Sequence, residues 1–495
     1  MKRFCIAPLL AVLALAPCQT VMAQKVEPTD AAVLSLRQAI TYQDSGVQHT
    51  LLVSLRALKD PAMKPIFEAL LKAPQPPMRI DGFLGLAEIA GERGADPALL
   101  LKLGDAPLRT VAITECLGLG LLKPEGIRTL LANKELTAYD RALLVAELHR
   151  LHEPWDAAML GDASASNTAE VAGLADLLML EKEKGDQARW EAFIKRLDEV
   201  DPAERTDLLR RLADASRHYE LAKAAEALLT LTKDSKGADR IGAIAAALKV
   251  SPAAGREALL AMAQSDRGVT NLVQAGLLML AADDAMQASD FDVLRGGQGV
   301  PDAIANAGQA LRTPNADAAP ALTALMESGN RAAAEWAVRQ ASKLPPETRR
   351  IMLLRAIDRL DGIDAPSMTD RLLSALAAQQ LIGFAPEDLI PRVTRLSGKP
   401  FVPESIVAAM CDLGTPEAAK FARMVRGKLA QRGESMALVT IAKASPTLSP
   451  AELVELGRIG GGGGRVEEPI QMQAAWLFLK QSNKVAQATP KLTPR

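Results

Sequence analysis

The residues best suited to chemistry are two histidines in the stretch ELHRLHEPWD. His149 and His152 are three positions apart, and Glu147 and Glu153 lie beside them. Imidazole and carboxylate groups are common ligands of Zn²⁺, but a zinc site needs a third or fourth ligand held in place, and only two other histidines occur in the chain. The alternative is a helix surface near a C-terminus, where imidazole suits the negative end of the helix dipole. We favour this alternative and predict no metal site.

A run of glycines near the end of the chain raises the question of a phosphate site. The stretch GRIGGGGGRVEEP contains Gly460–Gly464 between Arg458 and Arg465. A phosphate-binding loop requires G-x-x-x-x-G-K-[ST] between a strand and a helix, whereas here the residues before the glycines have a helical pattern and Arg465 is followed by valine. We therefore predict a flexible connection over 458–467. The alternative is a small anion nest between the two arginines.

Motifs for nucleophilic or hydrolytic catalysis are absent from the sequence. It contains no GxSxG, HExxH, SxxK or DxDxDG pattern. A glycan-cleaving enzyme would need a positioned carboxylate and aromatic platforms for sugars, but the tryptophans are scattered through helical stretches and are typical of packing residues: Trp155, Trp190, Trp336 and Trp476. We predict that the protein is not an enzyme and that it binds no cofactor and no small-molecule ligand.

The N-terminus has the pattern of an export signal. It begins MKR, continues with an apolar stretch over 6–16, and has small or tolerated residues at VMA, which ends at Ala23. This order predicts a secretory signal peptide over 1–23, cleaved after Ala23, and a periplasmic or secreted protein. The apolar stretch is shorter than the ~20 residues that span a bilayer, and no later segment is long enough, so we expect no transmembrane segment. A lipoprotein attached at Cys18 is the less favoured alternative, because proline precedes that cysteine.

Two cysteines remain after removal of the signal peptide. Cys116 and Cys411 are almost three hundred positions apart, and both follow the apolar pattern of a helix. An oxidising compartment permits a disulfide, but two isolated cysteines are not a disulfide framework. We expect both to be small core residues.

Composition favours an all-α fold with no nucleic-acid partner. Of the 495 residues, 48% are apolar and only 3% aromatic, so the core is built mainly from alanine and aliphatic side chains. Alanine and leucine are strong helix formers, whereas the aromatic and threonine residues that favour strands are sparse. The formal net charge is −1 with both signs mixed throughout, which gives no footprint for nucleic acid or an anionic membrane.

The strongest signal is repetition of helix pairs. Apolar positions at i, i+3, i+4 and i+7 recur in stretches of 12 to 18 residues from about residue 30 to 483, and Pro, Gly, Asp or Asn separates them. The second helices of successive pairs begin 30 to 32 residues apart in two runs: Met78, Leu108, Ala138 and Glu170, then Gly237, Val269, Val300 and Arg331. Such a period predicts an α-solenoid of stacked helix pairs.

One unit shows a family resemblance. The sequence DPALLLKLGDAPLRTVAITECLGLGLLKPEG, residues 96–126, resembles a HEAT repeat of the short bacterial type: a first helix, a turn with Asp, then a second helix that opens with an apolar residue and Arg and ends in Leu-Gly. The resemblance extends over much of the chain after the signal peptide. It implies a scaffold that binds proteins, here in the cell envelope, and it implies no chemistry.

Arginines recur near the start of the second helices. They are Arg79, Arg109, Arg141, Arg240, Arg331 and Arg371. They could line one face of the solenoid and bind an acidic segment of a partner. The alternative, which we favour, is a ladder of Asp–Arg pairs between neighbouring repeats, with Asp105, Asp140, Asp239 and Asp370 as the acids.

The predicted organisation therefore has five parts. After the signal peptide come the HEAT-like repeat array (24–457), the glycine-rich linker (458–467), a terminal capping helix (468–483) and a disordered tail (484–495). The capping helix should dock on the last repeat. The competing function is an envelope enzyme, or a subunit of one, with an unrecognised carboxylate site in the solenoid groove. A deep pocket where acids converge would favour the enzyme, and an open curved surface would favour the scaffold.

Overall fold

A computed structural model describes residues 27–41, 45–104, 106–182, 187–235, 237–396, 406–407, 413–464 and 466–492. All regular structure in these ranges is helical and none is strand, so the all-α prediction is confirmed. The predicted signal peptide, the lipidation position Cys18 and Cys411 lie outside the described residues.

The helices are short and follow one another closely. The first part of the chain forms α1 (Pro28–Thr41), α2 (Ser45–Arg56), η1 (Pro61–Met63), α3 (Lys64–Leu70), α4 (Pro76–Ile89), α5 (Pro97–Leu101), α6 (Ala106–Gly118), α7 (Pro124–Leu131), α8 (Ala138–Arg150), η2 (Ala157–Leu160), η3 (Ala163–Ala165) and α9 (Ala169–Lys182). The middle part forms α10 (Gln187–Glu199), α11 (Pro202–His218), α12 (Ala222–Leu231), α13 (Ala238–Val250), α14 (Pro252–Ser265), α15 (Val269–Ala281), η4 (Asp283–Ala285), η5 (Ala288–Leu294), α16 (Val300–Arg312), α17 (Ala319–Met326) and α18 (Arg331–Gln340). The last part forms η6 (Ala341–Lys343), α19 (Pro346–Asp358), η7 (Arg359–Gly362), α20 (Met368–Ile382), η8 (Pro386–Asp388), α21 (Leu389–Leu396), α23 (Pro416–Val425), α24 (Gln431–Ala444), α25 (Pro450–Arg458), η9 (Ile459–Gly463), α26 (Glu468–Gln481) and α27 (Val485–Leu492).

Proline and a capping side chain start many of the first helices. Asp60, Asp96 and Asp201 each precede a proline, and the carboxylate of each accepts a hydrogen bond from the backbone N–H two residues later. Proline suits the first helical turn because its missing N–H would have had no partner in the helix. Capping boxes start α20 at Ser367 and α25 at Ser449. These signals fix where each helix begins, as the sequence pattern predicts.

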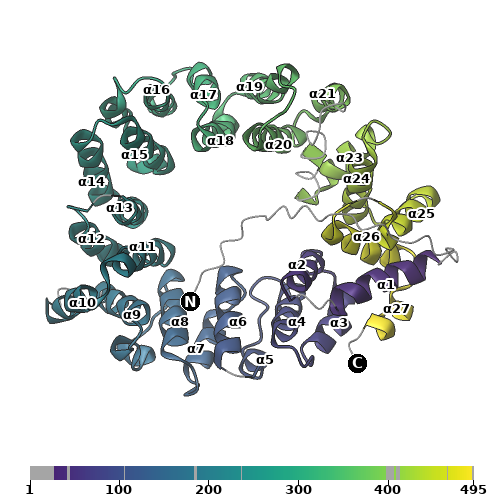
Figure 1. Ribbon diagram of the computed structural model, residues 1–495, viewed down its shortest axis with the longest axis horizontal. Helices are drawn as coiled ribbons and strands as arrows, with labels where there is room; N and C mark the ends of the chain where they lie inside the picture. Colours follow the sequence, from purple (N-terminus) through teal and green to yellow (C-terminus); the bar gives the residue numbers. More distant parts are fainter. Residues whose placement is uncertain are drawn as a thin grey trace.

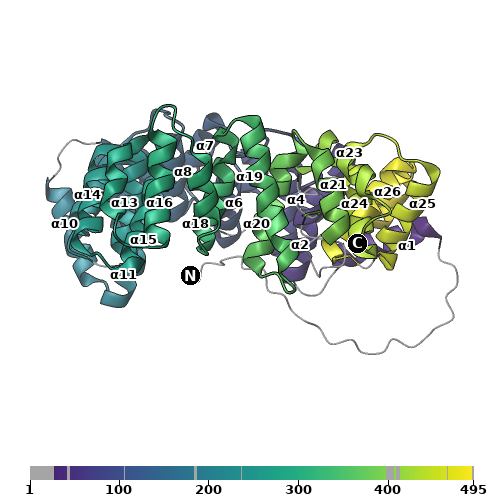
Figure 2. The same cartoon turned by 90° about the horizontal axis from the view of Figure 1, so that it is seen from above.

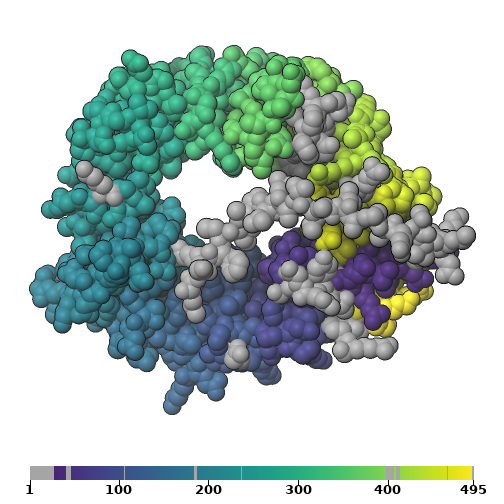
Figure 3. All heavy atoms as spheres, viewed as in Figure 1, coloured from purple at the N-terminus to yellow at the C-terminus, as the bar shows by residue number. Residues whose placement is uncertain are grey.

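The helices are arranged in a ring with two layers. Figure 1 shows α6, α8, α11, α13, α15, α18, α20 and α26 on the inner side, and α5, α7, α10, α12, α14, α17, α19 and α25 on the outer side. Seen from above, most helices stand side by side, roughly along the axis of the ring (Figure 2). The space-filling view shows an opening in the middle (Figure 3). The apolar core runs between the two layers.

The two ends of the chain meet and close the ring. Helix α26 packs against α24 and α25 on one side and against α1 and α2 on the other, and α27 packs against α1 and α3. One apolar cluster contains residues of both termini, from Ala32 to Met78 and from Leu438 to Leu492. We call this contact of α1, α2 and α3 with α25, η9, α26 and α27 the ring joint. The helix over 468–481 therefore covers the first helix pair as well as the last, and it does not cap a free end.

Two parts of the predicted organisation are wrong. The tail expected to be disordered from 484 contains α27, because Ala488 and Leu492 are each 1% exposed and pack at the ring joint. The first part of the flexible connection expected over 458–467 is also helical: α25 continues into η9 (Ile459–Gly463), which is kinked at Gly462, where φ is 93°.

Candidate functional site

Two of the six arginines proposed for partner binding form hydrogen bonds to turns between helices. Arg109, which is only 7% exposed, donates to the carbonyl oxygens of Gly104 (2.8 Å) and Glu135 (3.1 Å). Arg141 donates to the carbonyl oxygens of Leu131 (3.0 Å) and Asn133 (2.7 Å), just beyond the end of α7. A planar guanidinium suits this task because its fork of N–H groups reaches two acceptors at once. Both side chains are therefore engaged inside the chain.

The other four arginines do not share one environment. The guanidinium of Arg79 lies beside Gly104, with Nη1 3.1 Å from the position of a Cβ there. Arg240 and Arg371 are half-buried. Arg331 is exposed, and its Nε lies 2.7 Å from the Glu335 carboxylate one turn along the same helix. The structure thus gives these recurring positions different local roles.

Charged pairs join neighbouring units, but they have other members than the acids predicted for the Asp–Arg ladder. Asp140 and Asp370 close the capping boxes of α8 and α20, and Asp105 lies outside the described residues. Neighbouring units are instead joined by pairs whose members are 29 to 38 residues apart, which is about one repeat: Arg56–Glu88, Arg256–Asp290, Arg350–Asp388, Arg392–Asp358 and Arg426–Glu455. This spacing between an arginine and an acid was the sequence signal that could have identified them.

The histidine pair does not form a ligand set. His149 lies in the last turn of α8, and its Nδ1 is 3.4 Å from Nε1 of Trp155. His152 lies beyond the helix with φ of 56°, and its side chain is 83% exposed. Within the described ranges, no group of three or more His, Cys, Asp or Glu residues is placed to hold a metal ion.

Cys116 is a core residue. It is 0% exposed, and burial raises the pKa of its thiol to about 12. A thiol with such a pKa is almost fully protonated at neutral pH and is a poor nucleophile. The prediction of a structural role for Cys116 agrees with this environment.

The glycine run is part of the ring joint. A Cβ at Gly460 would lie 2.6 Å from Cα of Ala475, and a Cβ at Gly457 would lie 2.8 Å from the Phe478 ring, so both glycines let α25 and η9 approach α26 closely. Arg458, one of the two arginines of the suggested anion nest, donates to the carbonyl of Gly463. The other, Arg465, lies outside the described residues.

A buried charge cluster joins α2 and α4. Arg56 (5% exposed) donates to Asp81 over 2.9 Å and, through two nitrogens, to Glu88 over 3.0 and 3.1 Å. Nδ1 of His49 is 3.1 Å from the other Asp81 oxygen, while its side chain is 48% exposed. The hydrogen bond that His49 donates to the Asp81 carboxylate raises the pKa of His49. We refer to these four residues as the α2–α4 cluster.

The sequence analysis missed the α2–α4 cluster, although its spacing is regular. His49 and Arg56 are seven residues apart on one helix, Asp81 and Glu88 are seven apart on the next inner helix, and the two sets are offset by 32 residues. Residues seven apart lie on the same helix face. One repeat length therefore relates the two halves of the cluster.

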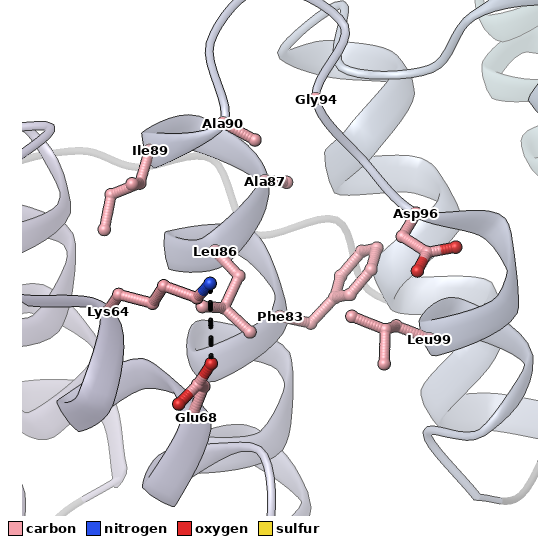
Figure 4. A pocket seen from close by; sticks show the side chains of 10 residues that line it. All are labelled: Lys64, Glu68, Phe83, Leu86, Ala87, Ile89, Ala90, Gly94, Asp96 and Leu99. Carbon is pink, nitrogen blue, oxygen red and sulfur yellow. Dashed lines mark ion pairs between the residues drawn. The ribbon is translucent and has the colours of Figure 1, made fainter. Parts of the chain in front are cut away.

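A groove opens between α3 and α5 above α4. Its volume is about 370 Å³, and its wall is mainly apolar, with Phe83, Leu86 and Leu99 turned toward it (Figure 4). Two acids line it: Glu68 lies 3.9 Å from Lys64, and Asp96 caps α5. The two carboxylates lie apart, on opposite sides of the groove (Figure 4). The groove therefore offers an apolar surface and no paired carboxylates for acid–base chemistry.

No protein-family model, curated protein or solved structure matches this chain. Within the described residues, none of the helices is both long and apolar enough to cross a membrane.

Proposed function

We propose that the protein is an exported, closed solenoid of HEAT-like repeats that acts as a non-enzymatic scaffold for proteins of the cell envelope. The observation that carries the proposal is the ring of stacked helices around an opening (Figure 3). Stacked helix pairs offer a long regular surface, and repeat proteins use such surfaces to bind partners. A ring adds an inner wall that can contact a partner from several sides.

The inner helices carry exposed apolar side chains that suit protein contact. On α6, Val111 is 48% exposed, and Leu119, directly after the end of the helix, is 47% exposed. The exposed Glu115 lies between them in the sequence, four residues from each. On α2, Val53 is 41% exposed. A mixture of apolar and charged side chains is typical of surfaces that bind other proteins without being permanently covered.

The alternative function is an envelope enzyme or enzyme subunit. It would need carboxylates that converge in a pocket. The two acids that line the groove above α4 already have partners: Glu68 pairs with Lys64, and Asp96 accepts a hydrogen bond from the backbone of α5. This arrangement supports the scaffold and not the enzyme. In the α2–α4 cluster, Arg56 holds both carboxylates.

Photo-cross-linking in the native host tests the scaffold. A benzophenone amino acid is placed at Val53 or Val111 on inner helices and, as matched controls, at Ile351 on α19 or Val454 on α25, both outer helices; all four side chains are exposed. We expect the inner positions to give one or two defined envelope-protein adducts and the outer positions to give few. If no position gives a defined adduct while the purified protein converts cell-wall or small-molecule substrates, the enzyme alternative replaces the scaffold.

The export step has its own test. Sequencing of the mature N-terminus should give Gln24, as cleavage after Ala23 requires. A lipid-modified Cys18 at the N-terminus would show a lipoprotein, and an intact Met1 on the protein from cells would contradict export by this signal.

A further inference from the structure

We propose that the ring joint is an acid-operated latch: protonation of Asp60 releases α26 from the first helix pair and opens the ring there before the other helix pairs separate.

The ring joint differs from other contacts between helix pairs because no loop connects its two sides. Helices α1 and α2 begin the described chain, and α26 and α27 end it. Terminal segments fray readily unless other contacts hold them, and local opening is easiest where few covalent connections must follow. Here each terminal segment is held by the other, so separation at the joint frees both.

Asp60 is the buried charge that spans the joint. It is 6% exposed, and its Oδ2 accepts hydrogen bonds from Nε1 of Trp476 and Nζ of Lys480, each over 2.9 Å. Its Oδ1 accepts from the backbone N–H of Ala62 in η1 (3.1 Å). One carboxylate thus ties the loop after α2 to two successive turns of α26. Trp476 is itself 1% exposed, so this bond lies inside the apolar cluster of the joint.

Other polar contacts across the joint are weaker anchors. Amide side chains of α26 make two neutral bonds, from Gln471 to the Ser35 hydroxyl and from Gln473 to the Ser54 carbonyl. Lys484 donates to the Thr29 hydroxyl. Neutral hydrogen bonds contribute about half as much as those to an ionised group.

Few charged groups surround Asp60. Lys480 faces it from α26, and η1 contributes a backbone N–H. A second charged pair across the joint, Lys491–Asp30, lies on its exposed side, where both side chains are more than half exposed and an ion pair contributes little. Burial works to raise the pKa of Asp60, but the bonds from Lys480 and Trp476 outweigh it and hold this pKa below the ordinary value of 3.8.

Protonation therefore acts on the latch in one direction. Because the folded pKa of Asp60 is depressed, its stabilising effect is present above the ordinary value and is lost as the pH falls through the folded pKa. A protonated Asp60 no longer pairs with Lys480 and no longer offers Trp476 a charged acceptor. The joint then rests on its apolar contacts, the neutral bonds of α26, the Lys484–Thr29 bond and the exposed Lys491–Asp30 pair.

Hydrogen exchange measured by mass spectrometry between pH 7 and pH 3 tests the latch, with rates corrected for intrinsic pH dependence. In the full chain we expect amides of α1, α2 and α26 to exchange several-fold faster at pH 3 than at pH 7, while those of α13 change little. Protonation at pH 3 of a carboxyl whose ordinary pKa is 3.8 changes the opening equilibrium by less than ~10-fold. Asp60→Asn, an uncharged isostere, should show the fast exchange already at pH 7.

Two further variants keep the test decisive if Asp60→Asn folds poorly. Lys480→Gln removes the ion pair and brings the folded pKa of Asp60 closer to its ordinary value, so exchange at the joint should already be faster than in the wild type at pH 7 and should rise less between pH 7 and pH 3. A disulfide from Ala31→Cys with Gly461→Cys, where the two Cβ positions lie 3.0 Å apart, should keep the joint protected at acid pH. Asp283→Asn is the control, because Asp283 pairs with Lys343 far from the joint.

Three outcomes would overturn the proposal. They are equal protection of α1, α26 and α13 at pH 3, unchanged exchange in Asp60→Asn at pH 7, and acid-induced exchange that the disulfide does not suppress.

Discussion

Gly460 is a residue whose identity is set by a neighbouring backbone. A Cβ there would lie 2.6 Å from Cα and 2.8 Å from the nitrogen of Ala475. Backbone atoms cannot rotate away as the end of a long side chain can, so η9 and α26 would have to move apart. From the sequence, five consecutive glycines predict a flexible connection. At this position, however, glycine permits close packing of two helices.

We predict that Gly460→Ala lowers the free energy of unfolding by about 1–3 kcal/mol, the usual cost of overpacking. Gly118→Ala is the control, since nothing lies within 4 Å of its added Cβ and alanine favours the helix. Urea denaturation of both variants measures the difference. Equal stability of Gly460→Ala and the wild type would show that η9 is loosely packed.

His49 predicts a pH dependence of stability. Its folded pKa is raised, first by the hydrogen bond with Asp81, so its stabilising effect is fully present below the ordinary value of 6.5 and is lost as the pH rises through the folded pKa. His49→Gln should therefore be destabilised relative to the wild type at pH 5.5 and nearly equal to it at pH 8.5. Denaturation midpoints at the two pH values measure this. A larger effect at pH 8.5 would contradict the assigned direction.

At the scale of elements, arginine side chains hold several turns between helices. Arg141 joins two carbonyls at the end of α7 to the start of α8, and Arg109 joins the carbonyl of Gly104, before α6, to that of Glu135, before α8. The recurrence of arginine at the start of second helices thus has a structural cause at these two positions. An acidic partner is not needed to explain them.

We predict that Arg141→Lys lowers the free energy of unfolding by about 1–3 kcal/mol, because an ammonium group cannot reproduce the two-pronged contact and leaves a carbonyl less well satisfied. Arg331→Lys is the matched control at a corresponding helix start. Its side chain is 59% exposed and pairs within its own helix, so the change should cost less than about 0.5 kcal/mol. Thermal and urea denaturation separate the two cases.

Local signals predict the elements well and their partners poorly. Proline after aspartate marks the start of η1, α5 and α11, and Ser449 with Glu452 marks α25. Helix α27 escaped prediction because its segment is polar and contains Pro490, and its buried residues find their cover on helices from the other end of the chain. The groove above α4 likewise depends on how far α3 and α5 stand apart, which no local pattern encodes.

At the scale of the whole molecule, ring closure brings the chain ends together. Lys491 Nζ is 3.2 Å from an Asp30 oxygen, and α27 packs on α1. A periodic sequence predicts stacking of neighbours, but it does not fix the curvature, and closure requires contacts between residues more than 400 positions apart. The closed ring was therefore beyond sequence reasoning.

We predict that a circular permutant folds. Residues 27 and 492 are joined by a short Gly/Ser linker, and the chain is opened between Asn315 and Ala316, in an exposed turn. Chains whose termini lie together tolerate such a cut at an exposed loop. Circular dichroism should show the wild-type helix content, with a melting temperature within about 10 °C of the wild type. A control opened within α13 should not fold, and failure of the first permutant would contradict the closed ring.

The ring joint also sets a waiting time during synthesis. Asp60 and Trp476 are 416 positions apart, and ribosomes add about 5–20 residues per second, so the first helix pair waits roughly 20–80 s for α26 to be made. During that interval the faces of α1 and α2 that α26 covers in the ring have no native cover. The nascent chain is therefore a natural client for chaperones that bind exposed apolar segments, from its first helices until its last ones emerge.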